Sequence, residues 1–191
     1  MTSITATAIL TGTTTASSTW KIDPAHSVAE FKVRHMMISY VRGAFSGLSG
    51  VLRLDETDYT HSTVEASIPA ASARTVDENL NAHLKNADFF DVENFPTLTF
   101  KSTNIRSTGG RNYAVTGDLT IRGVAKSVTL SVDDVSEPSI DPWGNRRIGI
   151  SGSAKVNRKD FGLTWNTPLE LGGVLVGDEV TITLDVQFIK E

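Results

Sequence analysis

Hydrophobic and polar residues alternate with a period of two along much of the chain after Trp20. In residues 28–35, one face consists of Ala29, Phe31, Val33 and His35, and the other of Glu30, Lys32 and Arg34. The same alternation recurs at residues 64–68, 113–121, 128–132, 148–156 and 180–188. A segment with one apolar face is typical of an antiparallel strand whose other face meets water, so the pattern predicts a mainly β protein.

Turn signals separate these segments. They are "STGGRN" at 107–112, "RGVAKS" at 122–127 and "PSIDPWGN" at 138–145. Short connections of this kind predict antiparallel neighbours. The segments "RGAFSGLSGVLRLD" and "TLTFKSTNI" bring the expected number of strands to about eight, and several would be about 30 Å long at roughly 3.3 Å per residue.

One segment, "TVDENLNAHLKNADFF", follows a helical pattern instead. Thr75 is a candidate N-cap, Asp77 and Glu78 would lie in the first turn, and Leu80 and Leu84 recur at helical spacing. The segment predicts one short amphipathic helix. Because its apolar stripe is thin, we expect it to lie on the sheet or across an opening.

The apolar faces must be buried either between two sheets or inside a closed barrel, and the alternation alone does not choose between them. A barrel of about eight strands can be filled by its own side chains or can hold one small ligand. Gly117 and Gly152 fall on apolar faces in the middle of strands. They would either leave room for a cavity or help the sheet to bend.

Composition narrows the function. The 191 residues fit one domain, and a net charge of −4 gives no general attraction for nucleic acid. The absence of cysteine excludes disulfides, thiolate metal sites and cysteine nucleophiles.

We predict a flexible tail over residues 1–19 and one domain over 20–191. No apolar run is long enough for a membrane span. The tail has no Lys or Arg, which favours a cytoplasmic location over a periplasmic or secreted one.

Motifs of standard enzymes are missing. The sequence has no GxSxG elbow, no P-loop and no GxGxxG after a strand, and its four histidines lack the spacing of zinc ligands. We therefore predict no metal site. His35 is the main polar candidate, because it shares a face with Phe31 and Val33 and needs a partner there. It could be a hydrogen-bonded structural residue, a ligand contact or a general base, whereas His26 would hold a turn.

Several arginines fall at or near strand ends, where a guanidinium could bind an anionic group. They are Arg42, Arg74, Arg122 and Arg158. Arg158 is the preferred candidate, because Asp160 could orient it and Phe161 and Trp165 would supply apolar surface. A structural salt bridge is the alternative interpretation.

Four of the eight phenylalanines lie within residues 86–100. Phe100 continues the apolar face of a strand with Leu98, but Phe89, Phe90 and Phe95 fall in the connection between helix and strand. An exposed connection would not carry three rings at this density. They are expected either to plug one end of a barrel or to line the mouth of an apolar pocket.

Four motifs resemble the YceI-like family of polyisoprenoid-binding proteins. In chain order they are "WKIDPAHSVAEFKVRHMMISYVRGAFSGLSG", "HLKNADFFDVENFPTLTFKST", "VTGDLTIRGVAKSVTL" and "VNRKDFGLTWN", and together they span about Trp20 to Lys190. The resemblance implies a lipocalin-like antiparallel barrel with a helix at its side or end. It also implies a long interior pocket for an isoprenoid or similar amphipathic lipid. Many family members carry a secretory signal, which the tail of this chain does not match.

These observations lead to the hypothesis of a non-catalytic protein that sequesters or carries a lipid, such as a polyprenyl phosphate or a quinone, without any other cofactor. The candidate ligand-binding residues are Phe31, Val33, His35, Phe45, Phe89, Phe90, Phe95, Leu98, Phe100, Leu119, Ile121, Arg158, Phe161 and Trp165. Two alternatives are an enzyme with His35 as general base and a stress or interaction protein with a packed core. A homodimer is compatible with all three hypotheses.

Overall fold

The computed structural model describes residues 17–170 and 172–191, and residues 1–16, with most of the predicted tail, lie outside the described residues. The strands are β1 (Ser17–Ile22), β2 (Val28–His35), β3 (Ser39–Phe45), β4 (Ser49–Asp55), β5 (Thr63–Pro69), β6 (Thr97–Gly109), β7 (Asn112–Ile121), β8 (Val124–Asp133), β9 (Ser139–Ile140), β10 (Arg146–Asn157) and β11 (Val176–Lys190). The helix α1 spans Glu78–Lys85, and 3-10 turns occur at Pro24–His26, Tyr59–His61, Ala70–Ser72 and Arg158–Phe161. The first strand thus begins at Ser17, inside the segment predicted as tail.

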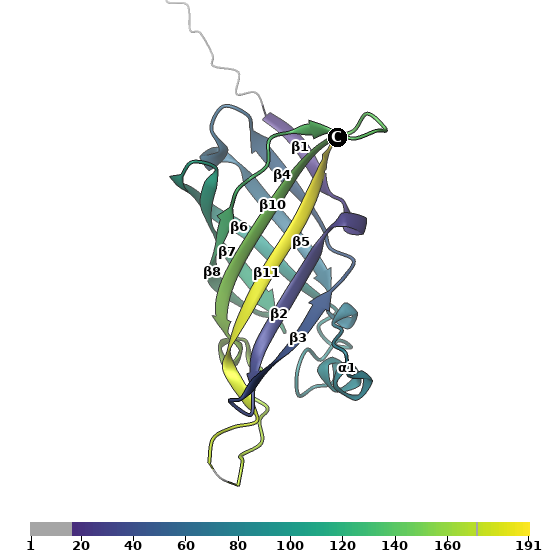
Figure 1. Ribbon diagram of the computed structural model, residues 1–191, viewed down its shortest axis with the longest axis vertical. Helices are drawn as coiled ribbons and strands as arrows, with labels where there is room; N and C mark the ends of the chain where they lie inside the picture. The colour runs from purple at the N-terminus through teal and green to yellow at the C-terminus, as the bar shows by residue number, and fades with distance from the viewer. Residues whose placement is uncertain (1–16, 171) are drawn as a thin grey trace, which may run out of the picture.

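The strands form an antiparallel barrel (Figure 1). Eight of them close the ring in the order β1, β4, β5, β6, β7, β8, β10 and β11, with β11 pairing back onto β1. The predicted all-β barrel with one short helix is therefore confirmed, and the sandwich alternative is wrong. Closure removes most free strand edges and turns every apolar face toward one interior.

Strand β11 organises one wall of the barrel because it is long enough to pair with two strands along the same edge. Its first part pairs with β2, from Val176 to Asp185, and its last part pairs with β1, from Phe188 to Lys190. β1 and β2 thus follow one another along β11, interrupted by the turn at Pro24–His26. On the other side, β4 pairs with β1 and β3 pairs with β2, so a break between β3 and β4 lies beside this turn.

This interruption opens the wall between β3 and β5, and the segment from residue 70 to 96, which includes α1, covers the gap. The main chain of Ala44 on β3 exchanges hydrogen bonds of 2.8 and 2.9 Å with Arg74. Asp77 caps α1, accepting hydrogen bonds from the main-chain N–H groups of Asn79 and Leu80, so the prediction of a Thr75 cap is wrong. Asp77 also brings a negative charge to the helix N-terminus.

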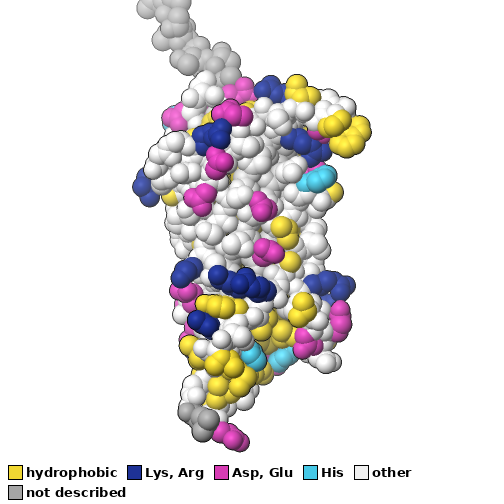
Figure 2. Space-filling model, in the orientation of Figure 1, with side chains coloured by type: hydrophobic (Ala, Val, Ile, Leu, Met, Phe, Trp, Pro, Cys, Tyr) yellow, Lys and Arg dark blue, Asp and Glu magenta, His cyan; other side chains and the backbone are white. Residues whose placement is uncertain are grey.

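The end of the barrel near β1 is filled by large side chains. Trp20, Ile148 and Phe188 are almost completely buried there. Outside them, the Arg147 guanidinium bridges the carboxylates of Asp23 and Asp141. Hydrogen bonds from Arg147 and then from His26 lower the pKa of Asp23 to about 2. Charged side chains are scattered over the outer surface (Figure 2), as the alternation predicted.

The two strand glycines prove to have different roles. A Cβ atom on Gly117 would lie 2.4 Å from the carbonyl oxygen of Lys101 and 2.5 Å from the ring of Phe100. Gly117 therefore makes room for a ring that packs over it. Gly152 lines the interior cavity, and its nearest neighbour would be 3.0 Å away.

Replacing Gly117 by Ala is expected to destabilise the barrel by about 1–3 kcal/mol, the usual cost of overpacking, because the carbonyl of Lys101 cannot move without disturbing the pairing with β6. Gly149→Ala is the matched control in β10, since its Cβ would meet its nearest atom at 3.7 Å. We expect the control to change stability by less than about 1 kcal/mol. Urea unfolding of the three proteins measures both effects, and equal losses would contradict this explanation.

Candidate functional site: an apolar cavity inside the barrel

The barrel encloses a cavity of about 240 Å³ that is partly open to solvent. This is far more than the roughly 10–15 Å³ that one water needs, and slightly below the roughly 300–1,000 Å³ of typical small-molecule sites. Every second residue of β11 from Val180 to Phe188 lines the cavity. This stretch of strand is about 26 Å long at roughly 3.3 Å per residue. The cavity is therefore elongated, and the hypothesis of a fully packed core is wrong.

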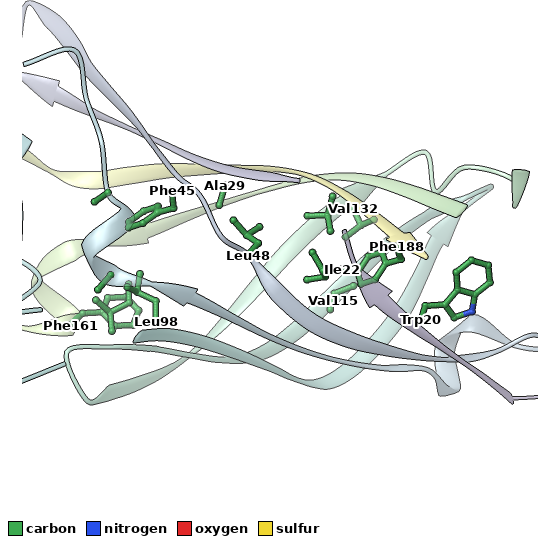
Figure 3. Packing of buried hydrophobic residues seen from close by; sticks show 14 of the residues in the cluster. Trp20, Ile22, Ala29, Phe45, Leu48, Leu98, Val115, Val132, Phe161 and Phe188 are labelled. Carbon is green, nitrogen blue, oxygen red and sulfur yellow. The ribbon is translucent and has the colours of Figure 1, made fainter. Parts of the chain in front are cut away.

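The lining is almost entirely apolar. Apart from Glu30, Thr99 and Arg158, it consists of hydrophobic side chains and one glycine. In Figure 3, Phe45, Leu98 and Phe161 of the buried cluster lie toward one end of the barrel, and Ile22, Val115 and Phe188 lie toward the other. Such an interior offers little to hydrogen-bond water and suits an apolar ligand.

The lining differs in burial between the end near the β2–β3 turn and the opposite end. At the opposite end the lining residues Ile22, Val186 and Phe188 are at most 8% exposed. Toward the β2–β3 turn, by contrast, Val33, Val176 and Val180 are only half-buried. A second, smaller cavity of about 80 Å³ adjoins the first and shares Val64, Val115, Val132, Ile150 and Phe188 with it.

Most of the residues predicted from the sequence do meet at this cavity. Its lining includes Phe31, Val33, Phe45, Phe89, Phe90, Leu98, Phe100, Leu119, Ile121, Arg158 and Phe161. Phe89 and Phe90 both face it, which explains the adjacent pair, because a non-strand connection can turn both rings inward. Phe90 packs edge-on against Phe45, with ring centroids 5.5 Å apart.

Three predicted residues lie outside the lining. Trp165 packs behind it against His83 and Phe89, with centroids 4.8 and 5.4 Å away. Phe95 covers the turn between β7 and β8, where a Cβ atom on Gly123 would come within 2.9 Å of its ring. His35, the last residue of β2, is not part of the lining, although its partner on β11, Val176, is. Strand parity gives the face of a residue but not its distance from the end of the cavity.

Arg158 lines the cavity, but main-chain carbonyls occupy its donors. Its Nε donates to the carbonyl of Gly177 at 2.8 Å, and its Nη1 donates to those of Leu163 and Trp165 at 2.6 and 2.9 Å. Nη2 donates to the carbonyl of Val176 at 3.4 Å and lies 3.6 Å from Asp178. The neighbouring carboxylate is thus Asp178, and the prediction that Asp160 orients Arg158 is wrong. Burial lowers the pKa of Arg158, and Asp178 opposes that shift.

Sequence reasoning also missed part of the lining. The predicted apolar faces of the strands near residues 64–68, 128–132 and 180–188 also line the cavity, although the predicted site does not include them. Strand parity indicates these residues in the same way as it indicates Phe31 and Val33. Leu48 and Leu163 come from outside the strands and helices and have no periodic signal, whereas Leu84 belongs to the apolar stripe of α1 that the sequence predicts.

The described part of the chain shows neither a cluster of metal-binding side chains nor a helix that could cross a membrane. Among residues 17–170 and 172–191, no group of three or more His, Asp or Glu side chains is placed to hold a metal ion. Within the same ranges, no helix has the length and apolar character needed to cross a membrane.

The fold and the cavity define an eight-stranded antiparallel barrel with an elongated apolar interior. The family model of the YceI-like domain matches residues 20–188. The chain belongs to this family.

Relatives and solved structures agree with this assignment. The chain is 32% identical to a UPF0312 protein of Pseudomonas aeruginosa (strain LESB58) over 186 residues, covering 96% of this chain and 93% of that one. It is also 32% identical to a UPF0312 protein of Staphylococcus aureus (strain N315), covering 87% and 94%.

Among solved structures, BcnA of Burkholderia cenocepacia aligns with a TM-score of 0.75 at 28% identity, covering 87% of this chain and 98% of that chain. A polyisoprenoid binding domain from Saccharophagus degradans aligns with a TM-score of 0.65 at 13% identity, covering 90% and 98%. At that low identity the second likeness shows the shared fold alone.

Proposed function

We propose that the protein binds one isoprenoid-type lipid in the barrel without transforming it chemically, and that it sequesters or carries this lipid. The elongated, almost wholly apolar cavity is the observation that carries the proposal. Burial of an apolar chain yields roughly 25 cal/mol per Å², before the costs of association are subtracted. The name of the Saccharophagus degradans domain, a polyisoprenoid binding domain, supports the same class of ligand.

The geometry also suggests where the head group lies. The cavity holds one cation, Arg158, whose donors are engaged by carbonyls. A buried phosphate without free donors would be costly, so the tail enters the barrel and a polar or charged head group stays at the opening. A quinone and a polyprenyl phosphate both fit this arrangement, because the tail supplies most of the affinity.

The enzymatic hypothesis gains no support from the structure. His35, its proposed general base, is not among the residues that line the cavity. A general base must come within hydrogen-bond reach of its substrate, directly or through one water.

Organic extraction of the natively purified protein is expected to release a long-chain isoprenoid lipid in close to equimolar amount, measured by mass spectrometry. Protein stripped of lipid is then titrated with farnesol and with geranylgeraniol, and the longer alcohol should bind more tightly because it buries more apolar surface. Geranylgeranyl phosphate should bind within about tenfold of the alcohol, a difference of roughly 1.4 kcal/mol. An extract without lipid, together with no binding of either alcohol, would refute the proposal.

A further inference from the structure

The turn between β2 and β3 exposes large apolar side chains at the end of the barrel opposite β9. Met36, Met37 and Ile38 are 41%, 57% and 76% exposed. The main chain of Met36 donates a hydrogen bond of 2.7 Å to Leu175, which holds the turn against the loop that carries the exposed Val174. We call Met36, Met37, Ile38, Tyr40 and Val174 the apolar tip. Figure 2 shows hydrophobic side chains gathered at this lower end of the molecule.

The backbone of this turn makes the choice of residues unusual. Ile38 donates its N–H to the carbonyl of His35 at 3.1 Å, and the two residues between them, Met36 and Met37, have φ angles of 52° and 63°. Within this three-residue connection, residues 35–38 form a β-turn, and β-turns with positive φ at both central positions strongly prefer Asn-Gly or similar pairs. Met36 and Met37 occupy these positions instead, although exposed methionines favour neither this turn conformation nor the solubility of the protein. Exposed apolar groups of this kind mark interaction surfaces.

Positive charge lies directly beside the apolar tip. Lys32 and Arg34 on β2 and Arg42 on β3 share the outer face of the hairpin, and the first two lie over the ring of Tyr40 at 5.4 and 4.3 Å. None of the three forms an ion pair with any residue in the ranges that the structure describes, whereas nearby Lys155 and Lys159 are paired with Glu179 and Asp178. Exposed Glu170 belongs to the loop that carries Val174.

We propose that the apolar tip is a docking surface for an anionic lipid bilayer. Its apolar side chains would enter the boundary between head groups and acyl chains, and Lys32, Arg34 and Arg42 would lie among the anionic head groups. Because Val33 and Val176, which line the cavity, lie beside this turn, docking brings the cavity close to the membrane. The use of docking to load or unload a lipid rests on the proposed function, but docking itself does not.

The test is binding of the full-length protein to large unilamellar vesicles, measured by flotation. The wild type is expected to bind vesicles of phosphatidylcholine containing about 30% phosphatidylglycerol, and to bind pure phosphatidylcholine or high-salt samples much more weakly. Met37→Asn with Ile38→Ser should lower the affinity at least roughly tenfold, because these side chains supply the buried apolar area. Asn is chosen because it tolerates positive φ, so the turn should persist.

A matched pair of apolar residues controls for general stickiness. Ile140 and Trp143, which are 71% and 80% exposed, lie at the opposite end of the barrel, in and beside the short strand β9. Ile140→Ser with Trp143→Ser should leave vesicle binding unchanged. Lys32→Gln with Arg42→Gln should remove most of the preference for anionic vesicles.

Three results would overturn the docking proposal: a wild type that ignores anionic vesicles, equal losses in the two apolar variants, or a wild-type dimer that the tip variant converts to a monomer without any vesicle binding. The last result would assign the tip to a second copy of the chain. Titration with geranylgeraniol in the absence of vesicles separates the two proposals. If the wild type binds geranylgeraniol but does not bind the vesicles, only the docking proposal is refuted. If it binds the vesicles but not geranylgeraniol, only the proposed function is refuted.

Discussion

Replacing Leu184 by Trp is expected to weaken the binding of geranylgeraniol about a hundredfold, or roughly 2.8 kcal/mol, while the barrel stays folded. Leu184 lies midway along the part of β11 that lines the cavity. Its partners on the neighbouring strands are Gly152 and Ala29, two small residues that leave the space beside it empty. An indole at this position would occupy the volume that the middle of the ligand needs.

Stability should change little in this variant. The indole enters an existing void rather than a packed core, so its added apolar area offsets the strain of insertion, and the free energy of unfolding should stay within about 1.5 kcal/mol of the wild type. Leu184→Met is the control, because it conserves volume and keeps the cavity open. Calorimetric titration gives the affinities and urea unfolding the stabilities. If the folded Trp variant bound the alcohol as the Met variant does, the interior could not be the binding site.

The strands and their apolar faces could be predicted because a barrel repeats one simple local rule. Each strand must alternate, and the alternation survives in the sequence at positions such as Phe31 and Val33. Closure could not be predicted in this way. It depends on which edges pair, and the double pairing of β11 with β1 and β2 has no periodic signature.

The candidate site was predictable to the extent that it consists of strand faces. Leu98 and Leu119 were placed correctly by parity alone, and they line the cavity. His35 has the correct parity but is not part of the lining, although its partner Val176 is, because parity does not say whether a side chain reaches the cavity. The carbonyl partners of Arg158 come from a loop and from the start of β11, so no pattern in the sequence indicates them.

The structure predicts a large loss of stability when Arg158 is replaced by Met. Arg158 is 5% exposed and ties main-chain carbonyls of Leu163, Trp165 and Gly177 to the end of β10. Met fills much of the same volume but donates no hydrogen bond. Several carbonyls would then lose their partner, whereas Asp178 would keep its ion pair with Lys159. We expect a cost of about 3–5 kcal/mol in urea unfolding, because each buried carbonyl left without a partner costs about 1–3 kcal/mol.

Arg122 provides the control for this substitution. It also donates to a carbonyl of the same region, that of Gly162, at 3.3 Å, but it does so near the surface. Arg122→Met should therefore cost less than about 1 kcal/mol. Adding Asp178→Asn to Arg158→Met should change the stability by less than about 1 kcal/mol, because Asp178 is 42% exposed and keeps its ion pair with Lys159 in the Met variant. Similar small losses in the two single variants would mean that Arg158 does not hold the loop, and a free guanidinium would then be available to a ligand head group.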